Sequence, residues 1–330
     1  YINLKKEEDK IDLNNSIINN SFIKENNDID FNEDNKINLN CSYELSNKED
    51  RLIFKERKKI ELKNNVYKLL KVKNDLKIYK YSNTQKKIYH NLIYQYFFDE
   101  FKDNDYKNAY IALFIGKKGD GKRSTINSLF NVIKGINQDY NYRFILIEES
   151  KEEKALENGL HLYYIKDINN KPIIIINCQG YGDIRGKDYD EEINNAFVYA
   201  FTQLINHINL VCFIGKETYE KLDIFTRYIF NCATSLFTED IIENFIVLVT
   251  HSNKYLIKKE WSNFIGSLKD DINFDDIRSK LNDKWKYFID NKSIFEDEIN
   301  ELTTYSFEKL NEIYKEKIIN SKKKITEMKL

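Results

Sequence analysis

The chain has 330 residues, of which 32% are charged, and its 52 Lys and Arg nearly balance its 53 Asp and Glu, for a formal net charge of −1. This length is sufficient for one large domain with extensions, and the lack of a basic bias excludes nucleic acid as the default partner. Four dispersed cysteines and apolar runs no longer than a strand predict a cytoplasmic protein with reduced thiols and no membrane span.

The N-terminal segments differ in composition. Residues 1–50 hold 12 Asn and 18 charged residues, a composition that buries too little apolar surface to order a chain, so we expect a disordered Asn-rich tail. Residues 51–106 carry apolar residues at mixed spacings, which predicts an extension made of a strand or hairpin followed by an amphipathic helix. The chain opens at Tyr1 and its one methionine is Met328, so we expect further sequence upstream.

Residues 107–262 alternate short β-rich runs with helix-length segments. The runs are "AYIALFI", "LHLYYIKD", "KPIIIIN", "INLVCFI" and "NFIVLVT". Strands that are apolar on both faces are typical of a mainly parallel sheet covered by helices on both sides. The sequence therefore predicts a three-layer α/β domain here.

The C-terminal segment, residues 263–330, has apolar residues at helical spacing amid dense charge. The first set is Ile277, Leu281, Trp285 and Ile289, and the second includes Ile299, Leu302, Leu310 and Ile313. The pattern predicts a helical extension, with the last helix in a coiled coil and with a lid packed on the domain as the alternative for the first helix.

Glycines single out one functional loop. Only 10 of the 330 residues are glycine, yet Gly116, Gly119 and Gly121 fall in "GKKGDGKRST", directly after an apolar strand. Together with Lys122 they match G-x-x-x-x-G-K, a loop whose backbone N–H groups cradle phosphates. The candidate phosphate-binding residues are Gly116, Lys118, Gly119, Asp120, Gly121, Lys122, Arg123 and Ser124. The plainer alternative is a tight strand-to-helix turn with an incidental lysine.

A second glycine-rich turn and a later strand end complete the motif set. The stretches "IALFIGKKGDGKRSTINSLF", "IIIINCQGYGDIRGKDYDEEI" and "YIFNCATSLFTEDIIENFIVLVTHSN" resemble the first, third and fourth motifs of P-loop GTPases in the group of septins, immunity-associated (AIG-type) GTPases and chloroplast import receptors. The resemblance covers about half of the chain. It implies a P-loop GTPase-like fold, GTP or GDP as ligand, a switch region with Asn177, Gly180, Gly182 and Asp183, and base-binding residues Thr250, His251 and Asn253.

Several residues depart from that family pattern. Arg123 replaces the Ser or Thr that binds Mg²⁺, and Asn177 replaces the Asp that steadies it; residues 137–170 contain no Thr to serve as the first switch. These changes argue against binding of Mg²⁺, so no metal ligands are assigned. They also leave the catalytic residues unknown. Arg123 either contacts phosphate in place of the metal, or turns to solvent or to Asp183.

The base-reading loop departs as well. It ends in Asn253 where the family has an Asp, which weakens the expected preference for guanine, and His251 is alternatively a structural histidine at a strand end. We therefore expect a guanine-nucleotide-binding switch or assembly factor with weak or no hydrolysis, able to self-associate through its G domain or C-terminal helices. The alternative is a pseudo-GTPase scaffold that binds no nucleotide, and an ATP-dependent P-loop enzyme lacks an assignable catalytic carboxylate.

Overall fold

The computed structural model describes residues 67–83, 85–89, 92–148, 159–179, 187–217, 244–252 and 286–321. The predicted tail, residues 1–50, lies outside these residues. No helix among the described residues is long and apolar enough to cross a membrane.

A mixed sheet forms the centre of the domain. In the described residues it has eight strands in the order β11-β10-β9-β5-β8-β7-β4-β3. Their bounds are β3 Gln85–Tyr89, β4 Ile93–Phe97, β5 Tyr110–Gly116, β7 Gly159–Lys166, β8 Pro172–Gln179, β9 Leu210–Lys216, β10 Phe245–Thr250 and β11 Lys286–Phe288. All neighbours are parallel except the pairs β3–β4 and β7–β8. The five strands predicted from apolar runs are β5, β7, β8, β9 and β10.

Strand β5 lies where the winding of the sheet reverses. The chain continues from β5 to β7 and β8 on one side and to β9, β10 and β11 on the other, so β8 and β9 flank β5. In open α/β sheets, ligands bind at such a switch point, beyond the carboxyl ends of the strands. The loop after β5 begins at this point.

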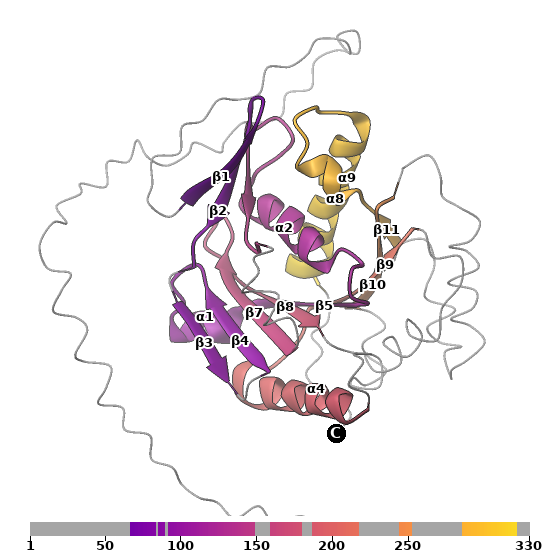
Figure 1. Ribbon diagram of the computed structural model, residues 1–330. Coiled ribbons are helices and arrows are strands. Elements are labelled where there is room, and N and C mark those ends of the chain that lie inside the picture. Colours follow the sequence, from indigo (N-terminus) through magenta and orange to yellow (C-terminus); the bar gives the residue numbers. More distant parts are fainter. Residues whose placement is uncertain are drawn as a thin grey trace, which may run out of the picture. The chain divides into compact units, whose positions relative to one another are not determined.

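Helices cover both faces of the sheet (Figure 1). The helices are α1 Asp103–Asn108, α2 Lys122–Ile133, α4 Lys187–Tyr199, η3 Ala200–Leu204, α8 Asn291–Ile294, α9 Glu301–Glu312 and η6 Ile313–Ile319. Alternate residues of β5 serve two cores: Ala112 and Phe114 pack with the α2 side, and Ile111 and Leu113 pack with the α4 side. This is the expected three-layer, P-loop GTPase-like α/β fold.

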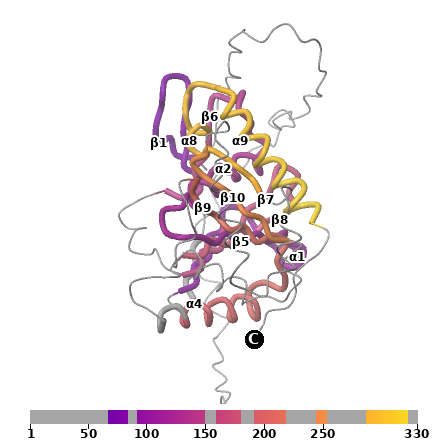
Figure 2. Tube along the Cα trace, turned by 90° about the vertical axis from the view of Figure 1, so that its right-hand side faces the viewer, coloured from indigo at the N-terminus to yellow at the C-terminus, as the bar shows by residue number. Residues whose placement is uncertain are grey.

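A smaller sheet flanks α2. It consists of β1 (Tyr67–Lys73), β2 (Leu76–Tyr81) and β6 (Tyr142–Ile145), so the hairpin expected in the N-terminal extension forms. In Figure 2, β1 and β6 lie in the upper part of the view together with α8 and α9. Arg143 of β6 donates from Nε to the carbonyl of Ile294, the last residue of α8, at 2.8 Å. Two buried amides of α2, Asn127 and Asn131, bond the backbone of residues 144–147.

The amphipathic helix predicted within residues 51–106 is wrong. Its apolar residues lie instead in the antiparallel pair β3–β4. In β4, the sequence "IYQYF" favours a strand because aromatic and β-branched side chains pack well on a pleated surface. Tyr96 stacks on Tyr163 of the neighbouring β7, with ring centroids 5.1 Å apart.

The C-terminal segment joins the core of the domain. The helical pattern predicted through Ile289 is wrong over 286–288, where β11 pairs with β10. The later helix forms as α9, but Phe307, Leu310 and Ile313 are buried in the α2-side core. Over the described residues its apolar face is therefore used within the chain and is not the seam of a coiled coil.

Candidate functional site

The loop from 116 to 122 requires its glycines for shape. A side chain at Gly116 would collide with the carbonyl oxygen of Ile214 on β9, so the strand ends can approach closely only with glycine there. Gly119 and Gly121 have φ of 87° and 90°, which glycine adopts without strain. This conformation lets the chain turn from the end of β5 at Gly116 to the start of α2 at Lys122.

Lys122 lies folded over this loop. Its side chain is buried, and Nζ donates to the carbonyls of Gly116 at 2.5 Å and Lys117 at 2.9 Å. Burial lowers the pKa of the ammonium to about 8, and the carboxylate of Asp120 offsets part of this effect. The site thus holds a poorly solvated cation, which an anion in the loop would compensate.

Asp120 and Thr250 brace the loop from behind. The buried Asp120 carboxylate accepts from the backbone N–H of Lys117 at 3.1 Å, and its carbonyl accepts from Thr250 Oγ1 at 2.7 Å. Thr250, predicted to read a base, is fully buried. The Thr250 hydroxyl therefore holds the loop in place. The neighbouring residue His251 is exposed, and its Nδ1 lies 3.0 Å from that hydroxyl.

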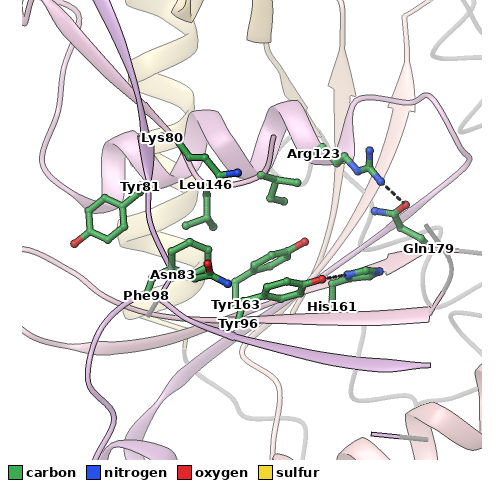
Figure 3. A pocket seen from close by; sticks show the side chains of 11 residues that line it. Lys80, Tyr81, Asn83, Tyr96, Phe98, Arg123, Leu146, His161, Tyr163 and Gln179 are labelled. Atoms are coloured by element: carbon green, nitrogen blue, oxygen red, sulfur yellow. Dashed lines mark hydrogen bonds between the residues drawn. The ribbon is translucent and has the colours of Figure 1, made fainter. Parts of the chain in front are cut away.

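Arg123 extends from the first turn of α2 toward the end of β8. Its guanidinium donates to Gln179 Oε1 at 3.5 Å, as Figure 3 shows. Between them and the small sheet lies a cavity of about 60 Å³. Its lining includes the rings of Tyr81, Tyr96, Phe98, His161 and Tyr163. The predicted phosphate-binding residue Ser124 follows Arg123 and is exposed.

Asn177 lies on the same face of the sheet as α2. It pairs with Phe114 of β5 and with His161 of β7. Each of these three residues lies two positions from the strand end that borders the site. The side chain is fully buried, and neither its Nδ2 nor its Oδ1 has a hydrogen-bond partner. An unmade bond of this kind costs about 1–3 kcal/mol per group, so the amide is suited to a ligand. The other predicted switch residues, Gly180, Gly182 and Asp183, lie outside the described residues.

These residues do not fit Mg²⁺, the metal that P-loop folds imply at this position. Mg²⁺ takes oxygen ligands, chiefly carboxylates, water and phosphate. The structure offers a guanidinium from Arg123 and a neutral amide from Asn177, while the Asp120 carboxylate is engaged by the loop backbone. Among the described residues, no group of three or more His, Cys, Asp or Glu could hold a metal ion.

A larger cavity lies beside the start of α2 and shares Ile147 with the first. It measures about 440 Å³ and is bordered by Ser124, His251 and residues 290–292, at the carboxyl ends of β10 and β11. Asn291 donates from Nδ2 to Thr125 Oγ1 at 2.9 Å, and its buried Oδ1 has no hydrogen-bond partner. The sequence analysis missed Asn291, which carries no motif of its own. Asn253, predicted to border the base, lies outside the described residues.

Lys216 is a second residue that the sequence analysis missed. It ends β9, the strand next to β5, and its Nζ lies 3.7 Å from where a Cβ on Gly119 would stand. No hydrogen bond or ion pair holds this ammonium among the described residues. Only its place at the end of a predicted strand could have indicated it.

Comparison with known proteins shows distant structural likeness only. No family model and no curated protein matches the chain. Solved structures that resemble it include Toc33 from Arabidopsis thaliana in complex with Mg²⁺ and GMPPNP, with 16% identity, a TM-score of 0.45, and coverage of 67% of this chain and 88% of that one. A structure of the chloroplast translocon components atToc33 and psToc159 has 16% identity, a TM-score of 0.47, and coverage of 66% and 86%. The bacterial selenocysteine-specific elongation factor EF-Sec has 16% identity, a TM-score of 0.40, and coverage of 66% and 29%.

Proposed function

We propose that this chain binds a guanine nucleotide, GTP or GDP, through the loop 116–122 and acts as a switch or assembly factor with weak or no hydrolysis. The observation that carries the proposal is the buried ammonium of Lys122 inside a glycine-shaped loop at the switch point of the sheet. A β-phosphate in the loop would accept from the backbone N–H groups of residues 118–122 and replace the loop carbonyls as the partner of Lys122.

The base and ribose would occupy the larger cavity. It adjoins the start of α2 at Ser124, and its volume of about 440 Å³ lies within the range of small-molecule sites. The orphaned Oδ1 of Asn291 offers an acceptor for a base N–H. Asn253 has a carboxamide in place of the family's carboxylate, so its side chain can donate as well as accept. Xanthine carries a carbonyl where guanine has its 2-amino group, and we therefore expect xanthosine diphosphate (XDP) to compete at least as well as GDP.

Weak hydrolysis follows from the residues around the phosphates. Phosphoryl transfer is accelerated by a metal that bridges the phosphates and by a residue that orients the attacking water. Arg123 and Asn177 replace the two metal-side residues of the resemblance, and the carboxylate beside Lys122, that of Asp120, is engaged by the loop backbone. Self-association through the G domain or the C-terminal helices is part of this proposal, and light scattering with and without GDP would test it.

Calorimetry with purified full chain tests the binding proposal. GDP should bind with one-to-one stoichiometry, and Lys122→Met should weaken it at least tenfold because it removes a charge-assisted contact but keeps the aliphatic stem. Lys171→Met is the matched control, since Lys171 is exposed at the opposite end of β8 and should bind like wild type.

The second candidate function is an interaction scaffold without nucleotide. The observation that favours it is that Lys122 already has two carbonyl partners inside its own loop, so the fold satisfies this cation without a ligand. Absence of GDP, XDP and ADP binding, or equal affinity in wild type and Lys122→Met, would select this candidate.

A further inference from the structure

Arg123 occupies the sequence position at which the P-loop GTPase resemblance has a metal-binding Ser or Thr. It follows Lys122 in the first turn of α2, and its guanidinium reaches across to Gln179, at the end of β8. It therefore spans the gap between the phosphate loop and the strand that carries Asn177 (Figure 3). A guanidinium is permanently charged and its planar fork matches two phosphate oxygens at once.

The loop is already strongly cationic without a metal. Lys117, Lys118, Lys122 and Arg123 belong to the loop or to the first turn of α2, and Lys216 ends the neighbouring strand. Two carboxylates oppose these five cations, Asp120 in the loop and Glu217 beside Lys216, which leaves a formal charge of +3. The carboxylate of Asp120 accepts from the loop backbone. A divalent cation entering beside Arg123 would meet like charge at short range, whereas a diphosphate or triphosphate would neutralise most of the local charge.

Asn177 completes the argument because it is buried and both its amide atoms are without partners. An aspartate there would attract a hydrated metal ion, but a carboxamide adds no charge. Its Nδ2 can donate to a phosphate oxygen and its Oδ1 can accept from a guanidinium. A bound phosphate that is also contacted by Arg123 would therefore give both amide atoms of Asn177 a partner.

We propose that the loop binds nucleoside diphosphates and triphosphates without Mg²⁺, with the guanidinium of Arg123 in the place of the metal and with Asn177 and Lys216 as additional phosphate contacts. This inference rests on the proposed function, since it specifies how the same loop holds its ligand. Mg²⁺ then competes with the protein for the phosphate oxygens and does not form a bridge between the protein and the nucleotide.

The affinity of the full chain for GDP, measured in EDTA and in millimolar Mg²⁺, tests this inference. Wild type should bind as tightly in EDTA as in Mg²⁺, or more tightly. Binding that is at least tenfold weaker in EDTA would overturn the inference but leave the proposed function standing. No binding under either condition would overturn both.

Variants at the two substituted positions sharpen the test. Arg123→Thr should lose at least tenfold affinity in EDTA, and Arg123→Thr combined with Asn177→Asp should recover binding only when Mg²⁺ is present. Lys171→Thr, which removes an exposed cation at the far end of β8, should behave as wild type. Direct uptake of Mn²⁺ in the presence of GDP, followed by electron paramagnetic resonance, should occur in the double variant only. Wild-type uptake equal to that of the double variant would contradict the assignment of Arg123.

Discussion

The affinity for nucleotide phosphates should fall as the pH rises through about 8, because Lys122 loses its proton there. Burial lowers the pKa of its ammonium, and the charge of Arg123 adds to this effect, while Asp120 and Cys178 oppose it. Only the protonated form makes a charge-assisted bond, so a bound phosphate raises this pKa above its value in the free protein. The contribution of Lys122 is therefore complete below the pKa of the free protein and declines above it.

The size of the effect follows from that pKa. With a value of about 8, the protonated share of Lys122 falls from about 0.9 at pH 7 to about 0.24 at pH 8.5, so affinity should fall about fourfold. The last pKa of a phosphate group is about 6, so its ionised share rises only from about 0.9 to about 1 across this window and does not oppose the trend appreciably. Calorimetry with GDP at constant ionic strength measures the slope. A flat profile in wild type, or the same slope in Lys122→Met, would refute the assignment of this lysine to the phosphates.

Three substitutions test the fold and the loop. Arg143→Met should lower the free energy of unfolding by about 3 kcal/mol, because this buried guanidinium donates to four carbonyls and lies 4.9 Å from the ring centroid of Phe307. Urea denaturation measures this change, and an unchanged midpoint would contradict the prediction. Tyr314→Phe should cost about 1–3 kcal/mol, since its hydroxyl donates to buried Asp167 at 2.6 Å, and a change below 0.5 kcal/mol would count against this bond. Gly119→Ala should lower thermal stability by about 1–2 kcal/mol through its φ of 87° and weaken GDP binding, whereas wild-type affinity would show that the loop conformation is irrelevant to the ligand.

The sequence predicts the sheet and the loop well because their signals are local. Strands such as β8 are apolar on both faces, and the glycines of the loop between β5 and α2 each have a backbone reason that any sequence of this fold would share. The five strands predicted along residues 107–250 occur in the expected order as β5, β7, β8, β9 and β10, whereas β6 at Tyr142–Ile145 was not predicted.

The features that the sequence did not predict depend on tertiary contacts. In β4, a three- and four-residue spacing of apolar residues looks helical, but the partners that decide the outcome lie on β7, more than 60 residues away. Likewise, α9 carries a seam typical of a coiled coil and is buried by its own domain. Lys216 and Asn291 become site residues only because neighbouring strands end beside the loop, and no local pattern marks them.

Glycine-selective ¹⁵N labelling gives the most direct test of nucleotide binding by this loop. The chain has only 10 glycines, so its amide spectrum is sparse, and Gly119 and Gly121 lie in the loop while Gly135 and Gly159 lie far from it along the chain. Addition of GDP, with EDTA and separately with millimolar Mg²⁺, should shift the signals of Gly119 and Gly121, as their N–H groups meet phosphate, and should leave Gly135 and Gly159 in place. A spectrum unchanged by saturating GDP, or shifts confined to glycines outside the loop, would contradict the account.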